Sequence, residues 1–577
     1  MEYQYDKTPY IPVGGILING WEAIVQTVSD RRNAAEKNRF ICCIECYQGV
    51  YLDEFERHIK LMGFDCMINV TNLYKCEKDI REMTASWVTE DELFGKKSPL
   101  SFNNFFDKKK VHNMLSTNQE RAQSIIVFGP GAACLFPDVN LMLYADMPRW
   151  EIQQRQRGHK IGGLGVNNAY ELPSKQYKRG YFVDWDICDS LKKELLPIAD
   201  YWIDSTVREL PKMIQGDTLR DGLKKAVRRP FRVVPFFDPA PWGGQWMKDV
   251  CGLDKSNRNY GWCFDCVPEE NSLYFQICGE LFEIPANNLV FYCTKELLGD
   301  NVEHNFGQSF PIRFDFLDTM GGGNLSLQVH PTPQYIRNTF GIPYTQDESY
   351  YLLDAGKDAF VYLGLKTDVN STEMIDALNK SHETGEPFDA DRFINKWPAN
   401  KHDHFLIPGG TIHCSGANAM VLEISATPSI FTFKLYDWGR MGIDGRPRPI
   451  NIAHGANVIQ WCRQTEEIKH KFINQIETVA EGNGWIEERT GLHEAEFIET
   501  RRHWFSKAVT HDTSNNVNVL NLIEGSAAIV ESPSAQFEPF IVHYAETFIV
   551  PAAVGEYTIR PFGDSCQRCG TIKAYIR

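Results

Sequence analysis

The sequence lacks the features that mark secreted, membrane-spanning or repetitive proteins. No apolar run is long enough to cross a bilayer, and the first residues show no charged segment followed by an apolar one, so we expect neither a membrane span nor a signal peptide. No solenoid-length repeat or low-complexity tract occurs. Positive charge is not in excess either. Its 60 basic and 75 acidic residues give a net charge of −15, which argues against bulk binding to nucleic acid or membranes.

The 16 cysteines, in a chain without a signal peptide, predict reduced thiols and a cytoplasmic protein. Three Cys-x-x-Cys pairs are scattered along the chain: Cys43/Cys46, Cys263/Cys266 and Cys566/Cys569. Two such pairs could meet in space as a four-cysteine zinc site, but buried structural cysteines are the favoured interpretation.

What is present suffices for several folded domains. With 577 residues, 43% hydrophobic and 23% charged, the chain has the composition of an ordinary globular protein of three or four domains. Its character changes near residue 225. Strands and helices alternate before that point and predict an α/β domain with a mostly parallel sheet. Beyond it, short strands about every ten residues predict antiparallel sandwiches or jelly rolls.

The apolar and amphipathic patterns also predict individual elements. In the first part we expect strands at 40–46, 124–132 and 139–146, and helices at 51–62, 189–202 (with a kink at Pro197) and 218–227. In the second part we expect strands at 271–277, 358–365 and 419–424, interrupted by helices at 371–381 and 468–480. From residue 498, short strands at 517–520, 527–531, 547–550, 555–559 and 571–576 predict a further β-barrel.

A candidate metal site begins with Gln328 and His330, which lie two residues apart in a predicted strand. Side chains at this spacing point to the same face of a strand, so an amide and an imidazole are aimed at one place. Glu348 follows downstream, and His413 closes the pattern Pro408-x-Gly410-x-x-His413. Two imidazoles, a carboxylate and an amide suit Zn²⁺ or a similar divalent metal and leave room for water or substrate.

The order of these four residues resembles the metal site of cupin jelly rolls, with Gln328 where the simplest cupins have histidine. The surrounding sequence resembles the type I phosphomannose isomerases, also called mannose-6-phosphate isomerases, over roughly residues 230–577. The matching stretches are 241–244 (PWGG), 311–318 (PIRFDFLD), 325–331 (LSLQVHP), 347–354 (DESYYLLD), 408–413 (PGGTIH), 422–424 (LEI), 435–440 (LYDWGR), 522–525 (LIEG) and 548–552 (FIVPA).

This resemblance implies one Zn²⁺, or another divalent metal, per chain, held by Gln328, His330, Glu348 and His413. It implies interconversion of mannose 6-phosphate and fructose 6-phosphate through a cis-enediol, with a base moving a proton between C2 and C1. The implied catalytic residues are Glu423, Lys434 and Tyr436, and either Glu423 or a metal-bound water assists proton transfer. Three domains are expected: 1–225; a metal-binding cupin at 226–497 with helical insertions at about 368–400 and 451–497; and a second cupin at 498–577.

Three positions depart from the family pattern. Gln346 and Asp315 stand where lysines are usual, and Lys434 stands where arginine is usual. Because a phosphorylated sugar needs cationic donors, the identity of the substrate stays open. The residues that remain to bind a phosphate are Ser326, Arg313, Lys434 and Arg440.

The N-terminal part resembles a degenerate P-loop nucleotide kinase. Residues 45–51 follow a strand where such a kinase carries its phosphate loop, but no Gly-x-x-x-x-Gly-Lys-Ser/Thr pattern is present. Residues 143–157 join a strand, Asp146 and an arginine-rich helix like the lid region of uridine-kinase-like proteins, and Gly129-x-Gly131 is a second candidate contact for phosphate. The domain is expected to bind a nucleotide or sugar phosphate, or to serve assembly. Arg149, Arg155 and Arg157 are expected on a solvated helix face.

The function therefore has alternatives besides a phosphomannose isomerase. One is a regulatory protein that senses a sugar and has lost turnover. Another is an isomerase of a different or unphosphorylated sugar. A third is a bifunctional enzyme with a working N-terminal kinase, against which the missing phosphate-loop lysine argues.

Overall fold

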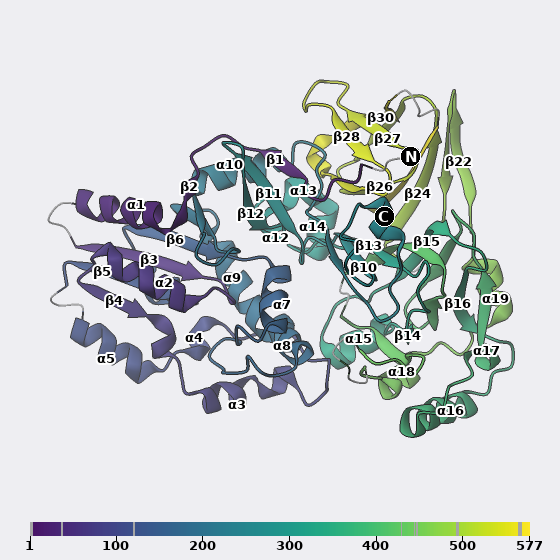
Figure 1. Cartoon of the computed structure of the whole chain (residues 1–577), viewed down its shortest axis with the longest axis horizontal. Helices are drawn as coiled ribbons and strands as arrows, with labels where there is room; N and C mark the ends of the chain where they lie inside the picture. Colours follow the sequence, from purple (N-terminus) through teal and green to yellow (C-terminus); the bar gives the residue numbers. More distant parts are fainter. Residues whose placement is uncertain are drawn as a thin grey trace. The chain divides into compact units, whose positions relative to one another are not determined.

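The computed structural model describes residues 4–35, 39–118, 122–427, 430–442, 445, 448–491, 496–563 and 568–577. The chain forms two compact units (Figure 1). The α/β unit consists of Tyr10–Lys225 and Ser272–Tyr292, and the β unit of Met1–Pro9, Ala226–Asn271 and Cys293–Arg577. Ser272–Tyr292 lies within the range expected for the metal-binding domain, yet it groups with the α/β unit.

A seven-stranded sheet forms the centre of the α/β unit, in the order β2-β8-β7-β6-β3-β5-β4. Its strands are β2 (Ile18–Asn19), β3 (Phe40–Cys46), β4 (Cys66–Asn69), β5 (Ser124–Gly129), β6 (Leu141–Asp146), β7 (Tyr201–Asp204) and β8 (Lys212–Gln215). The five from β4 to β7 run parallel, β8 is antiparallel to β7, and β2 is antiparallel to β8. Both β5 and β6 are buried throughout, as strands covered on both faces must be.

Helices flank this sheet: α1 (Gly20–Ala34), α2 (Leu52–Ile59), α3 (Glu77–Val88), α4 (Phe102–Phe105), α5 (Lys108–Asn118), α6 (Ala132–Leu135), α7 (Arg149–Arg157), α8 (Pro173–Arg179), α9 (Trp185–Leu195), α10 (Gly216–Ala226) and α12 (Asn287–Tyr292). A small sheet joins β1 (Tyr10–Pro12), β11 (Ser272–Ile277) and β12 (Glu280–Pro285). The helix predicted at 189–202 is wrong at its C-terminal end. The chain leaves the helix before Pro197, and Tyr201–Asp204 form β7 between β6 and β8.

Asp146, at the end of β6, organises the interior of the α/β unit. Its carboxylate is buried, pairs with Lys192 Nζ at 2.7 Å and accepts hydrogen bonds from Trp202 Nε1 at 3.2 Å and Asn288 Nδ2 at 2.8 Å. Asn288 comes from the returning segment Ser272–Tyr292. A sequence-distant amide therefore completes the donor set of this buried carboxylate.

Two antiparallel sheets form the first part of the β unit. One is six-stranded: β9 (Phe236–Asp238), β10 (Trp262–Cys266), β13 (Ile312–Asp318), β20 (Ala419–Ala426), β15 (Glu348–Ala355) and β18 (His404–Ile407). The other is five-stranded: β17 (Ile394–Pro398), β16 (Phe360–Leu365), β19 (His413–Ser415), β14 (Leu327–Val329) and β21 (Phe433–Tyr436). The associated helices are α11 (Trp246–Val250), α13 (Thr294–Leu298), α14 (Asp300–Phe306), α15 (Pro333–Phe340), α16 (Ser371–Thr384), α17 (Ala390–Phe393), α18 (Ile452–Val458) and α19 (Thr465–Lys471).

A second pair of sheets follows. The larger contains β22 (Glu477–Gly482), β23 (Trp485–Arg489), β24 (Ile498–Phe505), β31 (Cys569–Ile576), β26 (Asn518–Glu524) and β29 (Thr547–Val550). The smaller contains β25 (Val509–Asp512), β30 (Glu556–Pro561), β27 (Ala527–Glu531) and β28 (Phe540–His543). Their inner faces share one apolar core that includes Phe505, Leu520, Val530 and Ile559.

The helix predicted at 468–480 is also wrong beyond Lys471. Helix α19 ends at Lys471, and Glu477–Arg489 form a hairpin that pairs with β24. The turn Gly482-Asn483-Gly484 explains the change, because Asn-Gly favours tight hairpin turns. The Asn-Gly turn therefore decides the local structure, although the short polar sequence before it has a helical pattern.

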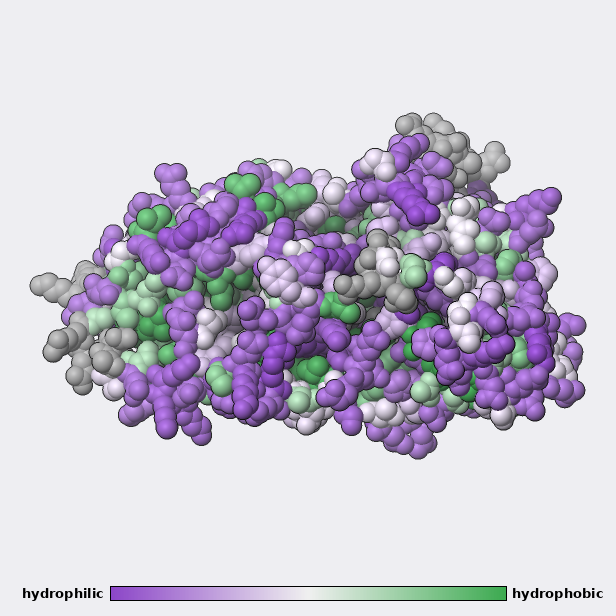
Figure 2. Space-filling model, turned by 60° about the horizontal axis from the view of Figure 1, so that its bottom comes forward, coloured by the Kyte–Doolittle hydropathy of each residue, from purple (hydrophilic) through white to green (hydrophobic). Residues whose placement is uncertain are grey.

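The cysteines agree with the interpretation as buried thiols. Every described cysteine is free, and Cys43, Cys46, Cys263, Cys266 and Cys569 are buried. Cys566, the remaining member of the three pairs, lies outside the described residues. Within the described ranges, no helix is both long and apolar enough to span a membrane, and Figure 2 shows a face on which hydrophilic side chains predominate.

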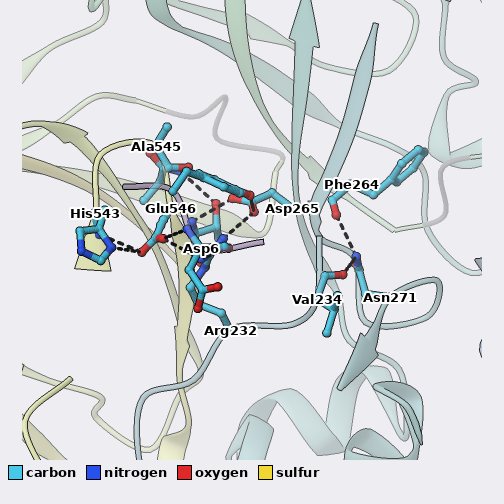
Figure 3. Close-up of polar contacts among 12 residues, drawn as sticks. Asp6, Arg232, Val234, Phe264, Asp265, Asn271, His543, Ala545 and Glu546 are labelled. Carbon is cyan, nitrogen blue, oxygen red and sulfur yellow. Dashed lines mark hydrogen bonds and ion pairs between the residues drawn. The ribbon is translucent and has the colours of Figure 1, made fainter. Parts of the chain in front are cut away.

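A buried charge network around Arg232 ties together three parts of the β unit that are distant in sequence (Figure 3). Arg232 contacts Glu546 at 2.8 Å and Asp265 at 3.4 Å, and it donates to the Asp6 carbonyl at 2.7 Å. The hydroxyl of Tyr5 donates to Asp265 at 2.5 Å. Burial disfavours the charge of Arg232, but Glu546 above all raises its pKa and keeps it charged. The chain's first described residues are thereby fixed to both β sandwiches.

We expect Arg232→Met to lower the free energy of unfolding of the β unit by about 3–5 kcal/mol, because Asp265 and Glu546 would stay buried without their cation. Urea denaturation followed by tryptophan fluorescence measures this change. Arg228→Met, at an exposed arginine four residues away, is the matched control and should change stability by less than about 0.5 kcal/mol. Equal stability of the two variants would contradict a structural role for the network.

Candidate metal centre

Three short strands carry the predicted ligands to one place between the two sheets of the first β sandwich. Gln328 lies in β14 and His330 directly follows it, while His413 begins the neighbouring strand β19. Gln328 and His413 are cross-strand partners. Glu348 begins β15 in the facing sheet. The site is therefore formed by both sheets.

The ligand atoms converge. Glu348 Oε1 lies 2.7 Å from His413 Nε2, and its Oε2 lies 3.0 Å from His330 Nε2. One ligand atom from each of these three buried residues lies within 4.8 Å of the other two. Although buried, His330 Nε2 and Glu348 Oε1 make no hydrogen bond of good geometry within the described structure. Lone pairs that face one another in this way fit a cation, which would satisfy all of them.

Backbone carbonyls fix the orientation of both imidazoles. His330 Nδ1 lies 3.1 Å from the Phe431 carbonyl and His413 Nδ1 lies 2.9 Å from the Thr411 carbonyl. An N–H on each Nδ1 donates to these oxygens, which leaves the Nε2 lone pairs directed at Glu348. Gln328 Nε2 lies 3.2 Å from His413 Nε2, and rotation of this amide presents its oxygen as a further ligand. These donors suit a divalent metal.

The Pro408–Gly410 turn that precedes His413 is held from three directions. Gly410 has a φ of +87°, which favours glycine, and its N–H donates to the His330 carbonyl at 2.8 Å. The Gly409 N–H donates to Asp347 Oδ1 at 2.7 Å. Arg463 donates to the Pro408 carbonyl at 2.8 Å. The turn therefore links the two histidines and the strand of Glu348 through backbone contacts.

Glu423 lies on the same inner wall, in β20. It is the cross-strand partner of both Tyr350 and Asp315. The Gln346 amide donates to Glu348 Oε2 at 3.1 Å and to Glu423 Oε1 at 3.4 Å, and so connects the metal ligand with this wall. Burial first, and then the nearby Glu348 and Asp315, raise the pKa of Glu423 well above its ordinary value. Glu423 is thus a buried carboxyl group whose surroundings favour the protonated form.

A cationic cluster surrounds Asp437, which follows β21. Arg440 and Arg448 pair with the Asp437 carboxylate at 2.7 and 2.9 Å, and Ser326 Oγ donates to it at 2.8 Å. Arg448 also donates to Ser326 Oγ at 3.0 Å. Lys434 is the cross-strand partner of Gln328, so the cluster continues into the metal site. Burial, helped by Arg448, lowers the pKa of Lys434 to about 7.

Two other predicted site residues have different surroundings. Arg313 lies in the facing sheet, where it pairs with Asp315 at 2.5 Å, rather than beside Asp437. Asp315 supplies a local counter-charge where the family usually has lysine. Tyr436 packs against the rings of Phe388 and Trp438, with centroids 5.6 and 5.2 Å away.

Sequence reasoning missed Arg448 and Thr411. Arg448 lies in a basic stretch eight residues beyond Arg440, and that charge could have identified it as a candidate anion contact. Thr411 acts through its backbone carbonyl, for which side-chain identity gives no signal. Tyr350 belongs to the matching stretch 347–354, but the sequence predicted no role for it. Its ring centroid lies 5.7 Å from that of His413.

In the α/β unit, the expected solvated arginine face is wrong for two of its members. Arg155 is buried and donates to the carbonyls of Gly49 and Ser205, both at 2.9 Å. Arg149 pairs with Asp189 at 2.8 Å, and both side chains are only 11% exposed. Arg155 thus holds two loops in place, and Arg149 ties α7 to α9. Arg157 is exposed, as expected.

We expect His330→Ala and His413→Ala to reduce bound divalent metal from about one per chain to below about 0.1, because each removes a buried ligand. Elemental analysis after metal loading and gel filtration measures this ratio, and the visible spectrum of Co²⁺-loaded protein reports the ligand field independently of activity. His382→Ala, at an exposed histidine on α16, is the control and should retain metal. Full metal content in His330→Ala would show that the ion binds elsewhere.

Comparison with known proteins gives separate matches for parts of the chain. A domain family described as a domain of unknown function, DUF8485, matches residues 20–228. Mannose-6-phosphate isomerase ManA of Bacillus subtilis (strain 168) is 22% identical over 341 residues, which cover 58% of this chain and 97% of that protein. A mannose-6-phosphate isomerase of Streptococcus mutans is 26% identical over 220 residues, 38% of this chain and 64% of that protein.

The solved mannose 6-phosphate isomerase of Bacillus subtilis aligns with a TM-score of 0.49 at 18% identity, covering 60% of this chain and 99% of that one. A solved point mutant of phosphomannose isomerase from Salmonella typhimurium gives a TM-score of 0.47 at 11% identity, with 60% of this chain and 99% of that one covered. The sequence matches confirm that this chain resembles the mannose-6-phosphate isomerases.

Proposed function

We propose that the β unit is a metal-dependent aldose–ketose isomerase that interconverts mannose 6-phosphate and fructose 6-phosphate. The observation that carries this proposal is the convergence of His330, Glu348 and His413 beside the buried carboxyl of Glu423. The similarity to proteins named mannose-6-phosphate isomerases supports it. We further propose that the metal is Zn²⁺ and that Gln328 is the fourth protein ligand.

In this proposal, Glu423 moves a proton between C2 and C1 of the open-chain sugar through a cis-enediol. Burial raises the pKa of Glu423, which makes this carboxyl group a stronger base than an exposed glutamate and suits it to accept and return a proton. The bound metal supplies Lewis-acid stabilisation of the negative charge that develops on the substrate oxygens. Gln346 holds Glu423 beside Glu348, and the surrounding sheets exclude bulk water from both carboxyl groups.

The cluster around Asp437 is the proposed phosphate site. When Lys434 is protonated, the cluster holds three positive charges, from Lys434, Arg440 and Arg448, and one negative charge, from Asp437. A phosphate dianion would balance the net charge of +2. Gln346 and Asp315 stand where the family usually has lysines, and the loss of these two cations argues against a phosphorylated substrate. Arg448 supplies a replacement cation from outside the stretches that match the family. Ser326 adds a hydroxyl donor next to Gln328.

We also propose an architecture for this function: two cupin barrels, with boundaries near 226–497 and 498–577, and an N-terminal P-loop-kinase-like domain at 1–225. The paired antiparallel sheets of the β unit support the cupins. The five parallel strands of the α/β unit support a nucleotide-kinase-like ancestry.

The metal-loaded protein is expected to convert mannose 6-phosphate to fructose 6-phosphate, and Glu423→Gln to lower kcat by roughly 10²–10⁴-fold, the range that a general acid–base group supplies. A coupled spectrophotometric assay measures the rate, and elemental analysis shows whether the variant keeps its metal. If metal-loaded wild-type protein gives no exchange between aldose and ketose phosphates, the proposed function is wrong.

Arg448→Met is expected to raise KM for the phosphorylated sugar by roughly tenfold or more, because a charge-assisted hydrogen bond contributes about 1.5–3 kcal/mol. Steady-state kinetics at pH 6.5, where Lys434 is largely protonated, measures this change. Arg337→Met, at an exposed arginine on α15, is the control and should leave KM unchanged. Unaltered KM in Arg448→Met would place the phosphate elsewhere.

A further inference from the structure

The α/β unit contains a cavity of about 260 Å³ that the isomerase reaction does not use. It lies at the carboxyl ends of the parallel strands β3, β4 and β5, where loops from each strand meet. Its walls include Tyr47–Asp53 after β3, Thr71 and Tyr74 after β4, Pro130 after β5, and Lys160–Gly165 after α7. Ligands of open α/β sheets bind at this edge, where successive connections leave in opposite directions.

The helix ends that could attract an anion at this edge are occupied by the protein's own carboxyl groups. Glu45 accepts hydrogen bonds from the N–H groups of Gly131 at 2.6 Å and Ala133 at 2.9 Å, at the start of α6. The Gly129-x-Gly131 turn, expected to approach a phosphate, is thus already engaged. Asp53 and Glu54 fill the first turn of α2, where the loop after β3 ends. Negative side chains there oppose a further anion.

The arginines near the cavity are engaged as well. Arg155 donates to the carbonyls of Gly49, Ser205 and Thr206, and Arg208 pairs with Asp53 at 2.6 Å. Both guanidinium groups lie over the ring of Tyr51, at 3.9 and 4.5 Å from its centroid. Among the residues that line the cavity, Lys160 supplies the sole basic side chain. A nucleotide's phosphates would meet one exposed lysine and the Asp53–Arg208 ion pair, which carries no net positive charge.

We propose that this cavity binds an uncharged, hydroxyl-bearing ring compound, a free monosaccharide or a nucleoside, and discriminates against its phosphate ester. The volume suits one or two rings, just below the range of pockets for drug-sized ligands. Hydrogen-bonding groups are available in its walls. Tyr51 and the glycine-containing loops at 48–50 and 160–165, with their backbone polar groups, are among the lining residues. Carboxylates such as Asp53 accept hydrogen bonds from hydroxyl groups but repel phosphate.

Calorimetric titration of the full chain tests this proposal, in the His330→Ala/His413→Ala/Arg448→Met background so that neither the metal site nor the proposed phosphate site of the β unit contributes. The probes are mannose, fructose, adenosine and uridine, each compared with its monophosphate. At least one neutral probe should bind, and its phosphate ester should bind roughly tenfold more weakly or worse. The sugar and nucleoside arms distinguish the two sources of ligand. Tighter binding of the esters, or no heat from any neutral probe at 10 mM (about the weakest affinity of interest), would overturn the proposal.

Three variants locate the site. Thr71→Trp fills the cavity and should abolish binding, while Tyr51→Phe removes one hydroxyl without adding volume and should weaken it roughly three- to tenfold. Lys160→Ala should change the affinity for the neutral probe by less than about twofold, because an uncharged ligand carries no charge that Lys160 could pair with. A tenfold loss in Lys160→Ala would show that the ligand is anionic, and unchanged binding in Tyr51→Phe together with Thr71→Trp would place it outside this cavity.

Discussion

The β unit depends on one constraint: charge removed from water must find a partner inside the protein. Its interior meets this requirement around Arg232, where a cation meets Asp265 and Glu546, and around Glu348, where a carboxylate meets two imidazoles. The first group joins segments distant in sequence and is complete as it stands. The second leaves atoms of His330 and Glu348 without hydrogen bonds. Pairing of buried opposite charges thus stabilises the fold at Arg232 and also shapes the candidate metal centre. The polar atoms of that centre that lack hydrogen bonds are where a metal can bind.

Much of the candidate site could be predicted because its signals are local. The two-residue spacing of Gln328 and His330 and the Pro-x-Gly turn before His413 are short patterns with definite geometry. The partners that a side chain meets through folding could not be predicted in this way. Arg448 comes to Ser326 from 122 positions away, and Gln346 reaches Glu423 across the sheet. Arg313, expected to bind the phosphate, pairs with Asp315 two residues further along the same strand.

The same limit explains the errors in secondary structure. The helical pattern of 189–202 continues through Leu195, yet Tyr201–Asp204 are recruited by the neighbouring strands β6 and β8. The pattern of 468–480 looks polar and helical in isolation, but an Asn-Gly turn at 483–484 and the open edge of β24 favour a hairpin at 477–489. In the α/β unit, local composition suggested anion-binding glycines and free arginines. Burial gave these groups internal partners, which no motif records.

The chain passes between the two units four times, after Pro9, Lys225, Asn271 and Tyr292. The α/β unit is therefore joined to the β unit by four chain connections, and it is not a simple N-terminal extension. Cutting at residue 225 would remove β11, β12 and α12, and would take Asn288 away from the buried carboxylate of Asp146. A fragment that ends at residue 225 is therefore not the whole α/β unit, because the buried carboxylate of Asp146 needs an amide that the chain supplies only after residue 271.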